Sequence, residues 1–400
     1  MNSPISPNFS APYYSSRHTR PVRFPTLKPG LLLISLGKEE FYIGESAQGV
    51  YIPTDPYMAI VRACDGHQST EAIAALCALP HGLILQFIDE LRAHNLIELR
   101  SGPPARAGLD ELANHYRERI RPEHELFTWR KGTSDGGESE VAARKNFAIL
   151  IFGHNRLARA LLANLQASGF SHTKIIPPVN QTFQRISAGD ICGITTRPVD
   201  IGRKQSEFHK EIILSSQLSH IKHNELSVYK EQHREQHGEQ RKEQRKEQHE
   251  RSTPPTISLA ISTTAATSDY VQRWISEGTP HLQISQPTTH SLEIGPLVLP
   301  GSRACLNCVQ LHRRDFLPPF ITLAAVDNLA QRHGRELTSS STSFIAGVIT
   351  PYICEFAARG ETSLVSHSLT IDLLEPLHGI VHHHWNVHPE CGCGSSDLLV

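Results

Sequence analysis

Two short cysteine motifs, far apart along the chain, constrain the fold of its C-terminal half more than any other feature. Cys305 and Cys308 form a C-x-x-C motif, and Cys391 and Cys393 flank a single glycine after 82 intervening residues. Four thiolates from two such pairs suit a tetrahedral zinc ion and saturate its coordination. We therefore predict a structural zinc that fastens the end of the chain to the loop after Pro300. Free buried thiols and a redox pair are the alternatives.

The remaining cysteines and the histidines near the second pair fit this zinc site less well. Four cysteines stand alone within apolar segments, where packing in the core is the better interpretation: Cys64, Cys77, Cys192 and Cys354. Four histidines precede the second pair: His382, His383, His384 and His388. In an extended segment successive side chains point to opposite faces, so the three consecutive histidines do not converge on one ion. A histidine ligand is therefore not favoured.

Composition and charge exclude several functional classes. The chain has 400 residues, of which 39% are apolar, enough for two or three domains with their own cores. Its net charge of −1 offers no chain-wide basic surface for nucleic acid or an anionic membrane. We see no apolar run long enough for a transmembrane helix and no secretory signal, so we expect a cytoplasmic protein. Cysteine pairs in that compartment are metal ligands before they are disulfides.

The N-terminal part of the sequence predicts a small independent domain. Residues 1–20 are rich in proline, serine and tyrosine and are expected to be a disordered tail, followed by a domain at 21–100. Short apolar runs separated by glycine-containing gaps predict three antiparallel strands, at 31–34, 41–43 and 50–52. Apolar residues at helical spacing predict three helices, at 57–63, 70–78 and 82–93. Three strands and three helices are typical of a winged-helix-like domain.

The rest of the chain predicts a linker and a larger α/β domain. Residues 101–140 are polar and are expected to be a linker with one amphipathic helix. The apolar run at 147–152 is typical of a buried parallel strand, and a helix and a second strand follow it. This order opens a doubly wound, Rossmann-like sheet in a domain at 141–400. An insertion at about 203–254, which contains a Glu/Gln/His/Arg-rich repeat, is expected to be a solvated spacer.

The turn after the first strand of this domain lacks two glycines of the nucleotide-binding pattern. A G-x-G-x-x-G turn lets the backbone approach the phosphates closely. Gly153 occupies the first position, but Asn155 and Ala158 occupy the others. We expect these side chains to crowd the space of a phosphate, and no acidic residue follows the second strand, which ends in Pro177-Pro178. The sequence therefore predicts that ATP is not bound.

Two parts of the chain resemble known families. The string GPLVLPGSRACLNCVQLHRRDF, with HPECGCG near the end, resembles the ThiF-like partner proteins of azole-forming peptide biosynthesis. Their parent group, the ubiquitin-activating-type adenylyltransferases, shares the sheet and the four-cysteine zinc. The stretch from RPVRFPTLKPG to AHNLIEL resembles the PqqD-like peptide-recognition domain. The resemblance implies a non-catalytic protein, without catalytic residues, that binds the leader of a ribosomal precursor peptide. It would present this peptide to a YcaO-type cyclodehydratase, which forms azolines.

The resemblance also implies where the leader peptide binds. An extended peptide can add a strand to an exposed sheet edge. The implied edge is the third strand, with Val50, Tyr51 and Ile52. The third helix would form the groove wall, with Leu85, Ile88 and Arg92 toward the peptide and Leu83, Phe87 and Leu91 toward the core. In the alternative interpretation all apolar positions of this helix are core and the N-terminal tail covers the edge.

Two other functions remain open from the sequence. The first is an adenylyltransferase that uses ATP to activate a peptide C-terminus. The second is a winged-helix regulator that binds DNA, against which the third helix argues, because Arg92 is its only lysine or arginine. We expect no nucleic-acid partner, and a homodimer is one option for the oligomeric state.

Overall fold

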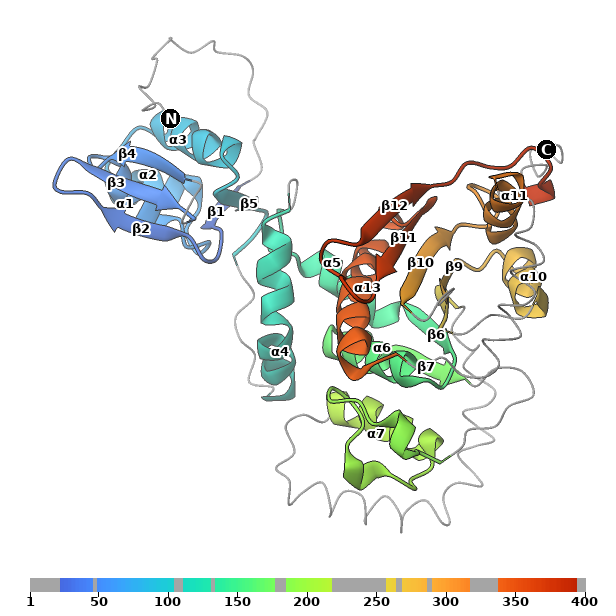
Figure 1. The fold of residues 1–400 in the computed structure, drawn as a ribbon. Coiled ribbons are helices and arrows are strands. Elements are labelled where there is room, and N and C mark those ends of the chain that lie inside the picture. Colours follow the sequence, from blue (N-terminus) through green and yellow to red (C-terminus); the bar gives the residue numbers. More distant parts are fainter. Residues whose placement is uncertain are drawn as a thin grey trace, which may run out of the picture. The chain divides into compact units, whose positions relative to one another are not determined.

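The structure is a computed structural model that divides into two compact units, Met1–Val141 and Ala142–Val400, which we describe separately (Figure 1). It describes residues 22–45, 49–103, 111–130, 134–176, 185–217, 257–263, 268–285, 290–316 and 337–393. The predicted N-terminal tail, the proline pair at 177–178 and the repeat within the predicted insertion lie outside these residues.

In the first unit, residues 22–100 form two small sheets and three helices around one core. A three-stranded antiparallel sheet has the order β2 (Leu32–Ser35), β3 (Glu40–Gly44), β4 (Gly49–Pro53). A second sheet pairs β1 (Phe24–Leu27) with β5 (Ile97–Arg100). The helices are α1 (Tyr57–Ala63), α2 (Thr70–Cys77) and α3 (His81–Ala93). The three predicted strands correspond to β2, β3 and β4 and the three predicted helices to α1, α2 and α3, whereas β1 was not predicted and the winged-helix character stays a prediction.

Alternation and capping explain these elements. In β3, Phe41 and Ile43 are fully buried while Tyr42 between them is not, as expected for a strand with one face on the core. The hydroxyl of Ser69 accepts a hydrogen bond from the Ala72 N–H and so caps α2, which ends at Ala78 in the left-handed conformation.

The segment expected to be a linker belongs to the first unit. It contains α4 (Glu111–Thr128) and α5 (Glu138–Ala142). The Trp129 indole donates to the carbonyl of Pro29 (3.2 Å), and the Trp129 carbonyl accepts from the Asn95 side chain (3.1 Å). The Gly136 N–H donates to the buried carboxylate of Glu98 (3.0 Å). These bonds fix both ends of the segment between α4 and α5 to the small domain.

The second unit is built on a seven-stranded mixed sheet. Its strands are β6 (Ala148–Phe152), β7 (His172–Ile176), β8 (Leu259–Ser262), β9 (His281–Ser285), β10 (Ser291–Val298), β11 (His367–Asp372) and β12 (Ile380–His384). The spatial order is β12-β11-β10-β9-β8-β6-β7. Strands β7, β6, β8 and β9 are parallel, and the rest of the sheet is antiparallel. The sheet is therefore Rossmann-like only in its parallel part.

Helices cover this sheet and bring distant parts of the chain together. They are α6 (Arg156–Ala167), α7 (Gln205–Gln217), α10 (Ser268–Ser276), α11 (Leu306–Phe316) and α13 (Ser339–Arg359). Helix α6 contacts both α7 and α13. Trp274 of α10 packs on Phe152 of β6, with ring centroids 4.8 Å apart. Among the described residues, no single helix is long and apolar enough to span a membrane, and only α2 and α3 meet that test jointly, with a bend of 118° between them.

The start of the predicted insertion is part of the core and corrects the expected boundary. Phe208 and His209 of α7 are each only 5% exposed, because α7 packs on α6. Apolar residues of α7 are few, so the sequence pattern did not distinguish it from the polar repeat that follows. Residues 218–256 lie outside the described part of the chain.

Candidate functional site

The carboxyl end of β6 lies where the chain reverses its direction across the sheet. From β6 the chain passes through α6 to β7 on one side, and later returns to β8 on the other side of β6. In open α/β sheets, ligands bind at the carboxyl ends of the strands at such a switch point. The residues that follow β6 and β8 therefore form the first candidate site.

The turn after β6 has a backbone that only glycine adopts easily. Gly153 has a φ of +136° and its N–H donates to the carbonyl of Ile176 (3.0 Å), which closes the turn against β7. The Asn155 side chain caps α6 by accepting from the Ala158 N–H (2.9 Å). Its amide group donates to the carbonyl of Thr263 after β8 (2.8 Å). Asn155 thus connects the start of α6 to the end of β8.

This geometry corrects the expectation that Asn155 and Ala158 crowd a phosphate. Both polar groups of the Asn155 side chain are bonded to backbone atoms of the protein, so the side chain is folded back on α6 and β8. Ala158 is completely buried, and its methyl group lies in the core. In any α-helix the N–H groups of the first turn have no carbonyl partner within the helix itself.

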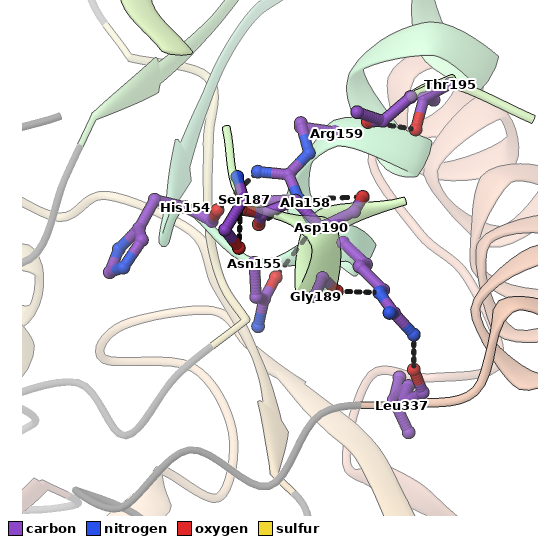
Figure 2. A network of polar contacts seen from close by, with 11 residues as sticks. His154, Asn155, Ala158, Arg159, Ser187, Gly189, Asp190, Thr195 and Leu337 are labelled. Carbon is purple, nitrogen blue, oxygen red and sulfur yellow. Dashed lines mark hydrogen bonds and ion pairs between the residues drawn. The ribbon is translucent and has the colours of Figure 1, made fainter. Parts of the chain in front are cut away.

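A buried ion pair underlies the start of α6. The Arg159 guanidinium is fully buried and contacts the Asp190 carboxylate at 2.6 Å and the His154 carbonyl at 2.7 Å (Figure 2). The other Asp190 oxygen accepts from the N–H and the hydroxyl of Ser187, both at 2.8 Å. Burial would raise the pKa of Asp190, but the Ser187 N–H and Arg159 outweigh it and hold that pKa below its usual range.

This pair was not predicted from the sequence. In the nucleotide-binding pattern an acidic residue is expected directly after the second strand, whereas Asp190 lies in the short helical turn Ala188–Asp190, fourteen positions after β7 ends. One signal was present: Arg159 stands among Leu157, Ala158 and Ala160, all of which are buried. A cation within an apolar helix face requires a buried partner.

Two histidines and a second arginine complete the surroundings. The His154 ring is directed away from the Arg159–Asp190 pair in Figure 2. Burial, with Arg159 and His154 nearby, lowers the pKa of His209 to about 4, so this imidazole is neutral at pH 7. Arg156 donates to the carbonyls of Gly189 (2.5 Å) and Leu337 (2.8 Å). These bonds hold the turn around Asp190 and the start of the α13 segment beside α6.

The second candidate site is the predicted cysteine cluster. The four Sγ atoms of Cys305, Cys308, Cys391 and Cys393 lie within 4.8 Å of one another. Three Sγ–Sγ separations are 3.8, 3.6 and 3.3 Å. Four thiolates about 2.3 Å from a tetrahedral zinc would be about 3.8 Å apart. The cluster is therefore compatible with zinc, and its position joins the start of α11 to the segment after β12.

The described residues next to the cluster contact the cysteines but do not add ligand atoms to it. The Asn307 amide lies 3.2 Å from the Cys391 Sγ, and burial raises the pKa of the Cys305 thiol to about 11. His388 is not in the cluster: Nε2 lies 2.8 Å from the Asp315 carboxylate and Nδ1 accepts from the Glu390 N–H. Only cysteines form this cluster among the described residues, in agreement with the predicted ligand set.

The third candidate site is a groove in the first unit, between β4 and α3. Val50, Tyr51 and Ile52 line it, at the sheet edge where the sequence placed a peptide. The opposite wall differs from the prediction and consists of Phe87, Glu90, Leu91 and His94.

The predicted split of α3 into a core face and a groove face therefore needs correction. Ile88 is 1% exposed and belongs to the core, and Leu85 and Arg92 do not line the groove. Phe87 and Leu91 are buried in the core as predicted, but they also line the groove. Positions 87, 90, 91 and 94 recur at the spacing of one helix face, and positions 85, 88 and 92 lie on another. Apolar spacing alone could not tell which of the two faces lay beside β4.

Comparisons with known proteins identify the fold. No protein-family model and no curated protein matches the sequence. Among solved structures, E. coli MccB with ATP has a TM-score of 0.59 at 12% identity, over 92% of this chain and 99% of that chain. The microcin C7 biosynthetic enzyme MccB in complex with N-formylated MccA has a TM-score of 0.58 at 13% identity, over 92% and 99%. PaaA has a TM-score of 0.56 at 13% identity, over 90% and 100%.

This chain has the fold of MccB. The likeness supports the predicted ThiF-like architecture, and it extends through both units. It also contradicts two sequence predictions, that ATP is not expected and that the protein is not an enzyme. Structures of this same fold contain ATP and its analogue AMPCPP, and one belongs to a biosynthetic enzyme. The prediction about ATP depended on the missing glycines at positions 155 and 158 and on the absence of an acidic residue after the second strand.

Proposed function

We propose that this chain is an ATP-dependent enzyme of ribosomal peptide biosynthesis that adenylates the C-terminus of a precursor peptide. In this reaction a carboxylate oxygen of the peptide attacks the α-phosphorus of ATP, and pyrophosphate leaves. The observation that carries the proposal is the likeness to MccB, which spans both units and was solved with ATP and with a peptide. The peptide-binding and the nucleotide-binding parts of such an enzyme would both have counterparts here.

The switch point supplies groups suited to ATP. The N–H groups of the first turn and the positive dipole end of α6 attract phosphate oxygens. Gly153 lets the backbone approach a ligand closely. The buried Arg159 is bonded to Asp190 and to the His154 carbonyl, and so holds the turn in place without contacting solvent. The neighbouring His209 is neutral at pH 7 and does not compete for the phosphates.

The groove of the first unit is the proposed binding site of the precursor peptide. Strand β4 is an edge of its sheet, and Val50, Tyr51 and Ile52 line the groove beside it. The role predicted from the sequence, presentation of a peptide to a YcaO-type cyclodehydratase, would use the same groove but requires no ATP on this chain. The ATP in the structures of this fold favours adenylation instead.

Nucleotide titration and pyrophosphate exchange test the proposal. The full chain should bind ATP and exchange labelled pyrophosphate into it only when a peptide with a free C-terminal carboxylate is present. The same peptide with a C-terminal amide should be inactive, because it has no carboxylate to adenylate. Absence of ATP binding by zinc-containing, folded protein would overturn the proposal.

A matched pair of glycine variants maps the nucleotide to the switch point. Gly153→Ala places a side chain at a left-handed backbone position beside the proposed phosphates, and ATP affinity should fall at least about tenfold, or about 1.4 kcal/mol. Gly278→Ala also places a side chain at a positive φ (+67°), but just before β9, at the amino end of a parallel strand, and should leave ATP affinity unchanged. Equal losses in both variants would place the nucleotide elsewhere.

A further inference from the structure

The groove of the first unit combines an apolar floor with one acidic side chain. Tyr57 and Phe87 contact each other beneath it, with ring centroids 4.6 Å apart, and Leu91 continues the apolar surface. Glu90 lies on the same wall, one helical turn from Phe87. A ligand that fills the groove must therefore present both an apolar group and a group that tolerates a carboxylate.

The other wall offers main-chain hydrogen bonds. Strand β4 pairs with β3 on one side and, within the described residues, with no strand on the other. An extended chain can continue the sheet there, and its alternate side chains then face the groove. Pro53 has no N–H, so the ladder would be confined to the preceding residues of β4. This geometry favours an extended peptide over a compact ligand.

The carboxylate of Glu90 is the acidic group of the groove wall. Within the part of the chain that the structure describes, it makes no hydrogen bond and no ion pair, although the residue is half-buried. Withdrawing such a group from water without a cation costs free energy, whereas a lysine or arginine beside it forms a charge-assisted hydrogen bond. A groove that closes over Glu90 is therefore selective for a basic ligand residue.

We propose that this groove selects a peptide segment with an apolar side chain and, two residues away, a lysine or arginine that pairs with Glu90. Alternate side chains of a strand are about 6.8 Å apart, close to the roughly 5–6 Å between side chains one turn apart on a helix. One side chain can thus lie on Phe87 and Tyr57 while the other reaches Glu90. The inference rests on the proposed function, because it names the chemistry of the precursor that the enzyme takes.

Selection from a library of random decapeptides tests this specificity on the full chain. Peptides enriched on the unmodified protein should carry a lysine or arginine two positions from an apolar residue. Glu90→Gln should abolish the enrichment of the basic residue and keep that of the apolar one. A synthetic enriched peptide should bind about threefold more tightly than its glutamine-substituted form, more so at low salt, and this preference should vanish in Glu90→Gln.

A neighbouring acid provides the control. Asp89 is exposed on the same helix but does not line the groove, so Asp89→Asn should leave the enriched pattern unchanged. The proposal is overturned if no peptide is enriched, if the basic residue is absent, or if it persists in Glu90→Gln. It is also overturned if binding appears only after deletion of residues 1–21, since the groove would then hold the chain's own start. Any of these results with intact pyrophosphate exchange would leave the proposed adenylation standing.

Discussion

The cysteine cluster and the turn after β6 were each predicted from a short sequence motif, but only the prediction of the cluster agrees with the structure. At the cluster, four thiols predicted from spacing lie within 4.8 Å of one another. At the switch point, two missing glycines predicted a blocked phosphate site, whereas the structure shows that Asn155 is the cap of α6 and is bonded to Ala158 and Thr263.

The difference lies in what each motif encodes. A metal site depends on the donor atoms, and sulfur is rare enough that its positions alone define the candidate ligands. A phosphate-binding turn depends on the backbone path and on side-chain direction, and other residues can provide both. At Asn155 a side chain performs the capping that keeps α6 in place, so its presence does not imply obstruction.

The largest effect is expected at the cluster. Because zinc binding contributes to folding, with apparent free energies of about 10–16 kcal/mol in zinc-dependent peptides, its removal should strongly destabilise the second unit. We expect one zinc per chain, and Cys308→Ser should abolish this stoichiometry and lower the melting temperature. Metal analysis and thermal unfolding measure both.

A second cysteine gives the control for the zinc experiment. Cys77 lies at the end of α2, outside the cluster, so Cys77→Ser should retain the zinc. Chelator treatment should destabilise the unmodified protein and affect Cys308→Ser little. The predicted zinc site would be contradicted if protein from zinc-supplemented cells, purified without chelator, contained no zinc. The cysteine spacing would then be no better a predictor than the glycine motif.

The next largest effect is expected at the ion pair beneath the switch point. Arg159→Leu leaves the Asp190 carboxylate without its buried partner, and the loss of one partner from a buried pair costs about 3–5 kcal/mol. Urea unfolding should show this loss. Replacing both residues, in Arg159→Leu with Asp190→Leu, should be less destabilising than the single change. If the single variant lost less unfolding free energy than the double variant, the ion pair would not stabilise the turn at the start of α6.

A smaller effect is expected from acid. Burial lowers the pKa of His209 to about 4 from its ordinary 6.5, so the unfolded chain binds this proton more readily between those values. The contribution of His209 to the unfolding free energy is complete above pH 6.5 and is lost as the pH falls toward 4. It amounts to at most about 3 kcal/mol.

Replacement of the histidine isolates this contribution. His209→Gln should flatten the dependence of the unfolding free energy on pH between 6.5 and 4.5. His172→Gln changes an exposed histidine at the start of β7 and should leave the dependence as it is. An unchanged slope in His209→Gln would show that other groups cause the sensitivity to acid.

Patterns that depend on residue type or regular spacing were predictable from the sequence. The strands and helices around Phe41, Ile60 and Ile84 follow from apolar periodicity, and the clustering of the four cysteines follows from their chemical type. Features that depend on contacts between distant segments were not predictable. The packing of α7 through Phe208, and the partner of Arg159, become evident only when residues far apart in sequence lie side by side.

The smallest effect concerns Asn155 and decides how the switch point should be interpreted. Asn155→Ala removes the cap of α6 and the bond to Thr263, and should cost about 1 kcal/mol of stability. Asn155→Asp keeps an acceptor for the Ala158 N–H but cannot donate to the Thr263 carbonyl, so its loss should be smaller than that of alanine. Thermal unfolding of the two variants separates the two bonds.

Asn155→Gly then tests obstruction directly. If the side chain crowded the phosphates, its removal would restore the missing glycine of the motif and ATP affinity would rise. The bonds of Asn155 to Ala158 and Thr263 predict the opposite, since they hold the start of α6 next to the end of β8 and are lost with the side chain. Affinity in nucleotide titrations should stay the same or fall as the start of α6 loosens. A clear gain in ATP affinity would show that the Asn155 side chain obstructs the phosphates. The glycine motif would then have predicted the switch point as correctly as the cysteine spacing predicted the cluster.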